Sequence, residues 1–280
     1  MMQIFNEVSN QCSKITTKKY STSFSSSINL LHKDFRTPIH NIYGFVRFAD
    51  EIVDTFQGYD KEKLLSEFKE ETFKAIERGI SLNPILNSFQ EVVNEYEIDH
   101  NLIESFFKSM EWDLVRVKYD KESYDEYIYG SAEVVGLMCL YIFCENDHVK
   151  YNQLKSSAQS LGAAFQKVNF LRDVRADFQD LDRNYFPQAD FSNFTKKMKA
   201  DIEDEIAEDF AKAYNGILML PAKARFGVYV AYKYYLSLFN KIKRTKASRI
   251  LENRIRIPNY SKLFIIMRAG VKNQLKLIKS

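Results

Sequence analysis

The stretch Gln166–Pro187, QKVNFLRDVRADFQDLDRNYFP, carries a polar stripe along an otherwise apolar helical pattern. Asn169, Asp173 and Asp177 follow one another at four-residue intervals. Residues four apart lie on one face of an α-helix, about 6 Å apart along its axis. Two carboxylates so placed repel each other unless a cation lies between them, and Mg²⁺ prefers such oxygen ligands. The stretch therefore predicts a packed helix with candidate metal ligands near its end.

A second stretch, Tyr43–Phe56, repeats this arrangement upstream. Asp50 and Asp54 have the same four-residue spacing. Glu51 directly follows the first of them, and Arg47 lies about one turn before it. The apolar pattern around both stretches predicts burial, and buried carboxylates need partners. Structural ion pairs with the nearby arginines are therefore the alternative to a metal site.

Together the two stretches resemble the paired aspartate-rich motifs of the squalene/phytoene synthase family, in the same order and with a similar separation. The first is similar to that family's R-x-x-D-[DE]-x-x-D pattern and the second to its N-x-L-R-D-x-x-x-D pattern, which ends in Y-[LF]-P. The matching residues are Arg47, Asp50, Glu51 and Asp54, then Asn169, Leu171, Arg172, Asp173 and Asp177, and finally Tyr185, Phe186 and Pro187. One departure follows the second motif, where Asp182-Arg183 stands in place of the usual Gly-Arg pair.

The rest of the chain predicts an all-α protein. Only nine glycines and five prolines occur among 280 residues, which favours long helices, and no alternating strand pattern of any length is present. No Pro/Gly/Ser-rich linker divides the chain, so residues 1–280 are expected to form a single domain. The resemblance implies an isoprenoid-synthase-type helical bundle with a central cavity.

Helical patterns and turn signals divide the chain into successive segments. The expected helices cover 4–19, a segment that begins near Pro38, 60–80, 85–97, a segment that follows Asp99, 123–145, the segment through Gln166, 193–216, 218–243 and the basic region 248–279. The last of these is interpreted either as a plain solvated helix or as a surface helix that contacts anionic lipid.

Two glycines, Gly130 and Gly136, interrupt the apolar segment 123–145. Each costs up to about 1 kcal/mol in a helix relative to alanine, so their presence indicates close helix contact or space for a ligand. The segment resembles the family's Y-x-x-A-x-x-V-G pattern at Tyr129, Ala132, Val135 and Gly136. The resemblance thereby implies that Tyr129 lines the cavity.

The resemblance also implies an enzyme that joins two prenyl diphosphates head to head through a cyclopropyl diphosphate. Its expected metal ligands are Asp50, Asp54, Asp173 and Asp177, with Mg²⁺ as the metal and Mn²⁺ as a substitute. Its expected diphosphate contacts are Arg47, Gln166, Asn169 and Arg172, with Tyr20, Ser21 and Phe24 from a hydroxyl-rich segment that also reads as a helix cap. Tyr43, Tyr129 and Tyr235 are expected to line the cavity and steer the reaction, together with the catalytic Arg47 and Arg172.

Phytoene synthesis from geranylgeranyl diphosphate, without NADPH, is the leading functional prediction. Use of farnesyl diphosphate to make a thirty-carbon product is one alternative, and a non-catalytic helical interaction protein is another. The net charge of +3 predicts no general affinity for nucleic acid. Cys12, Cys139 and Cys144 form no metal pattern and, with no signal peptide and no run of about 18 apolar residues, predict a cytoplasmic protein. Because the implied substrates and product carry long apolar tails, reversible contact with a membrane surface through an apolar or basic face is also expected.

Overall fold

A computed structural model describes residues 2–115, 118–175, 184–187, 189, 191–252, 254–274 and 278. Within these ranges the regular structure is helical, and the single β-bridge, between Lys118 and Asn184, stands outside any strand. The expected all-α fold is therefore confirmed. The helices are α1 (Met2–Tyr20), α2 (Thr22–Ile28), α3 (Lys33–Asp54), α4 (Lys61–Arg78), α5 (Pro84–Glu95), α6 (His100–Val115), α7 (Lys121–Ile128), α8 (Val134–Cys144), α9 (His148–Arg175), α10 (Lys196–Met219), α11 (Ala222–Arg244), α12 (Ala247–Ile250) and α13 (Asn259–Gln274), with the short segments η1 (Tyr129–Glu133) and η3 (Phe191–Asn193).

Side chains at the helix starts explain several of these boundaries. Asp60 accepts a hydrogen bond from the Lys63 amide at 3.0 Å and so caps α4. Asn83 caps α5, whose first residue is Pro84. Capping oxygens satisfy amides that the first helical turn leaves unpaired, and proline suits the first position because it has no amide to satisfy.

The C-terminal region differs from its expectation of one helix over 248–279. The short helix α12 ends at Ile250, and α13 begins only at Asn259, directly after Pro258. Proline disfavours helical geometry in the residue before it and cannot donate a backbone hydrogen bond, so Pro258 suits the position just before a helix. Pro38 is an exception, because α3 begins five residues before it, at Lys33, and not near Pro38 as expected. Residues 254–258 have no regular secondary structure, and the Arg254 side chain reaches Asp173 near the end of α9.

The apolar segment 123–145 is helical throughout, but it contains a π-helical turn. This turn, η1, joins α7 to α8 and adds one residue to the local winding. By length and hydropathy alone the run Lys121–Cys144 could also cross a membrane, contrary to the expectation that no stretch would qualify. However, 56% of its most apolar window is buried inside the fold, as in the core helix of a soluble protein.

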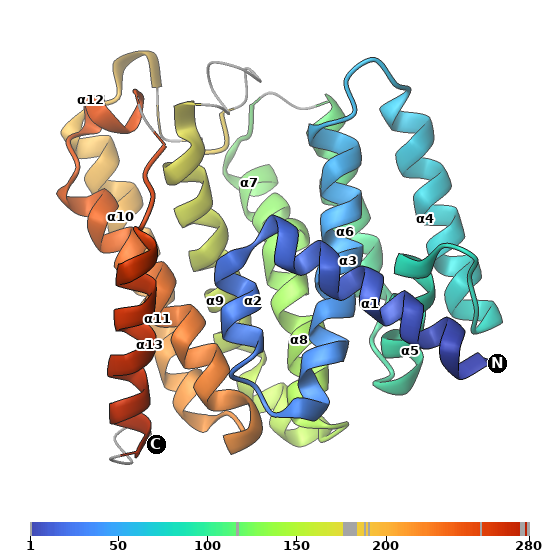
Figure 1. Cartoon of the computed structure of the whole chain (residues 1–280). Helices are drawn as coiled ribbons and strands as arrows, with labels where there is room; N and C mark the ends of the chain where they lie inside the picture. Colours follow the sequence, from blue (N-terminus) through green and yellow to red (C-terminus); the bar gives the residue numbers. More distant parts are fainter. Residues whose placement is uncertain are drawn as a thin grey trace.

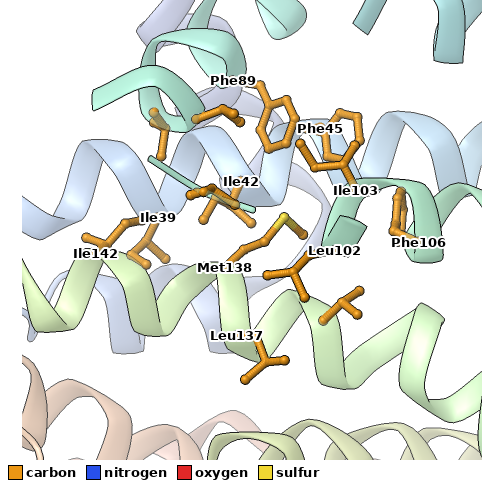
Figure 2. Close-up of a cluster of buried hydrophobic side chains, with 14 of the residues drawn as sticks. Ile39, Ile42, Phe45, Phe89, Leu102, Ile103, Phe106, Leu137, Met138 and Ile142 are labelled. Atoms are coloured by element: carbon orange, nitrogen blue, oxygen red, sulfur yellow. The ribbon is translucent and has the colours of Figure 1, made fainter. Parts of the chain in front are cut away.

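The core contains two large groups of buried side chains. The first lies where α3, α5, α6 and α8 meet, and Figure 2 shows its isoleucine, leucine, methionine and phenylalanine side chains between these helices. Within it Phe45 stacks on Phe89, with ring centroids 3.8 Å apart. The second is built mainly from α9, α10 and α11. The C-terminal ends of α3 and α9 lie at the same end of the bundle, at the top of Figure 1.

Candidate active site

A cavity of about 290 Å³ lies between α2, α3, α8, α9, α10 and α11. Most of its wall is apolar, as at Ile42, Leu140 and Phe165, so its interior offers little to hydrate a polar ligand. Polar lining groups include the side chains of Gln166 and Asn169 on α9. The cavity therefore combines an apolar interior with a few polar groups on the helix that leads to Asp173.

Close approach of the helices keeps part of this wall free of side chains. A Cβ added at Gly162 would lie 2.6 Å from the carbonyl oxygen of Ala132, and one added at Gly136 would lie 2.9 Å from that of Ala158. All four residues line the cavity. The expectation that Gly136 marks close helix contact is confirmed, as it is for Gly130, which lies against the backbone of Ser105.

Aromatic rings join α2, α3, α9 and α11 over one side of the cavity. Phe24 lies 5.9 Å from Tyr43 and 5.8 Å from Tyr235, measured between ring centroids. Tyr235 also stacks on Phe165 at 3.9 Å. Burial raises the pKa of Tyr43 to about 12 against the opposing effect of Arg47, and burial likewise raises the pKa of Tyr235. Both phenols are therefore neutral hydroxyl groups near neutral pH.

Hydrogen bonds connect these hydroxyls to the other predicted site residues. The Tyr235 hydroxyl donates to Asn169 Oδ1 at 3.4 Å, and Ser21 forms a side-chain hydrogen bond with Tyr43. Ser21 Oγ also accepts the Phe24 amide at 3.2 Å, which makes it the N-cap of α2. Gln166 donates weakly to Ser131 at 3.4 Å.

The end of α3 carries the first carboxylate group. Arg47 forms ion pairs with Asp50, one turn along the helix, and with Glu51. Its guanidinium also lies 4.4 Å from the ring centroid of Tyr20, at the end of α1. The Nε of Arg47 is buried and has no hydrogen-bond partner among the described residues, so it is a donor available to an anion. Asp54 is the last residue of α3 and is partly buried.

The end of α9 carries the second group, and part of it comes from a distant segment. Arg172 pairs with Asp173 at 2.5 Å, and Arg254 approaches the other oxygen of the same carboxylate at 2.7 Å. Arg175 fixes that segment by donating to the Glu252 carbonyl at 2.8 Å. Sequence reasoning did not include Arg254 in the site, because no pattern connects it to a residue 81 positions earlier.

Asp177 lies outside the described residues, as does the Asp182-Arg183 departure. Tyr129 was expected to line the cavity, but the cavity wall is formed instead by Ser131 and Ala132, and Tyr129 packs against the first core group. The π-helical turn explains this correction, because one extra residue rotates the positions that follow by about 100° relative to those before it.

Sequence comparison identifies the family to which this arrangement belongs. A family model described as squalene/phytoene synthase matches residues 17–261. The chain belongs to the squalene/phytoene synthase family. The protein is thus a prenyltransferase of the head-to-head type, from a family that uses a divalent metal and binds prenyl diphosphates.

Individual relatives are distant but cover much of the chain. A phytoene synthase of Arthrospira platensis is 25% identical over 288 residues, which cover 93% of this chain and 92% of that protein. A 4,4'-diapophytoene synthase of Staphylococcus haemolyticus is 24% identical over 200 residues, 70% of this chain and 69% of that protein.

Solved structures support the fold. A dehydrosqualene synthase in complex with a ligand superimposes with a TM-score of 0.80 at 18% identity, over 96% of this chain and 98% of that one. A squalene synthase from Alicyclobacillus acidocaldarius gives a TM-score of 0.74 at 19% identity, over 90% and 97%. The isoprenoid-synthase type of helical bundle is therefore confirmed.

The side chains at the two helix ends fit a divalent metal that is shared with a substrate. Asp50, Asp54 and Asp173 supply only oxygen donors, which Mg²⁺ and Mn²⁺ prefer. The described residues contain no group of three or more carboxylate, histidine or cysteine side chains arranged to hold a metal by themselves. Such a donor set suits an ion that takes its remaining ligands from phosphate oxygens and water.

Proposed function

We propose that the protein condenses two geranylgeranyl diphosphates head to head into phytoene, with Mg²⁺ bound by Asp50, Asp54, Asp173 and Asp177. One observation carries the proposal: the carboxylate-bearing ends of α3 and α9 lie at the same end of the bundle, and both helices line one apolar cavity. A prenyl diphosphate could place its diphosphate at the carboxylate-bearing helix ends and its apolar prenyl chain in the cavity.

The charged side chains would bind and orient the diphosphate. Arg47, Arg172 and Arg254 are cations that can neutralise charge as the carbon–oxygen bond breaks. The Nε–H of Arg47, which has no partner in the described part of the chain, is a donor for this purpose. A bound divalent metal would supply Lewis-acid stabilisation of the leaving diphosphate.

The apolar wall would protect the cation that remains after the diphosphate leaves. Water would capture such a cation, so the chemistry needs a dry space. The faces of Phe24, Phe165, Tyr43 and Tyr235 can each stabilise a passing cation by about 0.5–2 kcal/mol. Because both tyrosines are neutral, their hydroxyls can also hold a proton or hydrogen-bond to diphosphate oxygens. We infer that a proton leaves the final cation and that no NADPH is used.

A farnesyl diphosphate-using enzyme is the second candidate, favoured by the similarity to a diapophytoene synthase. Incubation with Mg²⁺ and either farnesyl or geranylgeranyl diphosphate, followed by mass spectrometry of the hydrocarbon, separates the two. We expect a forty-carbon hydrocarbon from the second substrate and none in the presence of a chelator. A thirty-carbon product alone would transfer the assignment to the farnesyl enzyme, and no hydrocarbon from either would reject both.

We also infer that the chain works as a single domain. The cavity supports this, because its wall residues run from α2 near the N-terminus to α11 near the C-terminus and belong to both core groups. Coincident unfolding transitions followed by circular dichroism and by Trp112 fluorescence would test the single domain.

A further inference from the structure

The last helix, α13, turns a row of large apolar side chains to the outside of the protein. Leu263, Phe264, Met267 and Val271 are each between 55% and 59% exposed. Their spacing places them on one face of the helix, and we call this face the outer stripe. Ala269 is buried, and α13 packs on α11. Figure 1 shows α13 at the edge of the bundle.

Charge is distributed very unevenly along the chain. Residues 221–280 contain 15 Lys and Arg against one Asp or Glu, so their formal charge is +14. Residues 1–220 contain 25 Lys and Arg against 36 Asp and Glu, which gives −11 and accounts for the net +3 of the whole chain. The near-neutral total conceals a strongly basic C-terminal region, and the outer stripe belongs to it.

Cations border the outer stripe on both sides. Arg268 and Lys272 follow it along one edge, close to Lys233 of α11. On the other edge Lys262 donates to Thr22 Oγ1 at 3.0 Å. None of these four cations forms an ion pair within the described ranges. Burial, together with repulsion from Lys272 and Arg268, lowers the pKa of Lys233, which indicates that these like charges are crowded.

We propose that the outer stripe is a docking face for the surface of an anionic lipid bilayer. An amphipathic helix with apolar residues on one face and cations beside them binds such a surface by burying the first and pairing the second with anionic headgroups. A second copy of the chain is a poorer occupant. Symmetric pairing through this face would bring two strongly basic regions together.

The position of α13 would bring a bilayer bound at the outer stripe close to the cavity. Helices α2 and α11, which adjoin α13, supply Phe24 and Tyr235 to the cavity wall. A bilayer under the outer stripe would therefore lie beside the cavity that receives the apolar chains. Only this functional consequence rests on the proposed prenyl transfer, because lipid binding itself needs no substrate.

Flotation with vesicles, using the full chain without substrate, tests the proposal. We expect binding to vesicles that contain phosphatidylglycerol, weaker binding to pure phosphatidylcholine, and loss of binding as salt rises. Leu263→Ser with Phe264→Ser should weaken binding by roughly tenfold or more, because two apolar anchors are lost. Arg268→Glu with Lys272→Glu should cause roughly a tenfold loss on the anionic vesicles.

Helix α1 provides a matched control. Ile4 and Val8 are 66% and 53% exposed, so Ile4→Ser with Val8→Ser removes a similar exposed pair from another helix. This control should bind vesicles as the wild type does, and circular dichroism should show that all variants fold. Wild-type binding by both α13 variants, or an equal loss in the α1 control, would overturn the proposal.

Self-association is tested in parallel by sedimentation without lipid. A dimer that dissociates only in the α13 variants would assign the outer stripe to a second copy and overturn the proposal. A protein that binds anionic vesicles but yields no hydrocarbon would refute the proposed function alone. One that makes hydrocarbon but ignores vesicles would refute only the docking face.

Discussion

The carboxylate groups at the ends of α3 and α9 are held in different ways. On α3 the cation comes from the same helix, since Arg47 pairs with Asp50 and Glu51 three and four residues further on. On α9 the carboxylate of Asp173 takes one cation from its neighbour, Arg172, and a second from Arg254, in the connection between α12 and α13. The first group therefore forms wherever its helix forms, whereas the second also requires the C-terminal region to be folded.

The surroundings of the two ends differ as well. The α3 group is bordered by the Tyr20 ring at the end of α1. Behind the α9 group, the buried carboxylate of Asp113 accepts hydrogen bonds from Tyr127 and Tyr185, and Tyr185 stacks on Phe170 of α9 with centroids 4.0 Å apart. If both ends act on one substrate, they should be equally important for turnover but unequal in their contributions to stability.

The largest expected effect is on activity, and it should be similar at the two ends. Asp50→Asn and Asp173→Asn should each reduce turnover by roughly a hundredfold or more, because each removes a proposed metal ligand. Product formation at saturating Mg²⁺ measures this, with Asp201→Asn on the exposed face of α10 as the control. A large loss at one end only, in correctly folded protein, would show that the ends do not act together.

The next effect is a dependence of stability on pH that belongs to the α3 side. Burial lowers the pKa of His40 from 6.5 to about 4, and repulsion from the positive charges of Lys14 and Lys18 adds to this effect. Because the folded pKa is lower than the unfolded one, the stabilisation is complete above pH 6.5 and is lost as the pH falls through 4. The free energy of unfolding should fall by about 3 kcal/mol between pH 7 and pH 4 from this group alone.

Urea unfolding of wild type and His40→Leu at both pH values isolates this contribution. The variant should lose less stability on acidification, because it has no imidazole to protonate. An unchanged loss would mean that other groups cause the acid sensitivity.

A smaller stability effect should come from the hydroxyls behind the α9 end. Tyr127→Phe should lower the free energy of unfolding by about 1–3 kcal/mol, because Asp113 loses a buried donor at 2.8 Å. Tyr124→Phe is the matched control, since the Tyr124 hydroxyl is buried without a hydrogen-bond partner among the described residues. Removal of the Tyr124 hydroxyl should hardly change the free energy of unfolding. Equal losses of stability in the two variants would show that the hydrogen bond from Tyr127 to Asp113 is not what stabilises this region.

The smallest expected stability effect concerns Arg254. Its side chain is 52% exposed, so Arg254→Ala should change the free energy of unfolding by less than about 1 kcal/mol. The variant should nevertheless raise KM by roughly tenfold, since a cation near the proposed diphosphate site is lost, and Arg254→Lys should restore part of the affinity. A KM equal to that of the wild type would limit Arg254 to an incidental surface contact.

The same difference between the two ends explains what could be predicted from the sequence. Helical spacing alone predicts that Arg47 and Asp50 share one face, because the relation is local. The family resemblance of both motifs also predicted the helical bundle, and the family match and the fold confirm it. Arg254 could not be predicted, because its approach to Asp173 depends on how the chain turns between Ile250 and Asn259.

Two further features of the structure depend on tertiary contacts and could not be predicted from the sequence. The position of Tyr129 depends on a π-helical turn, which leaves no clear mark in an apolar pattern. Likewise, α1 packs on α3 and α5 through hydroxyl groups, with Ser13 and Ser88 hydrogen-bonded at 2.7 Å and Gly44 allowing the close approach. Hydroxyl-rich helix faces normally predict exposure to solvent, so this contact could not be inferred from composition.

The central claim, head-to-head condensation that ends in proton loss, is tested most directly by incubating the purified protein with Mg²⁺ and geranylgeranyl diphosphate, with and without reduced nicotinamide cofactor. The absorbance of a conjugated triene distinguishes the product of proton loss from that of hydride transfer. We predict that the triene forms at the same rate in both reactions. A hydrocarbon that forms only with the cofactor and lacks the triene would contradict this account and assign the protein a squalene-type reaction.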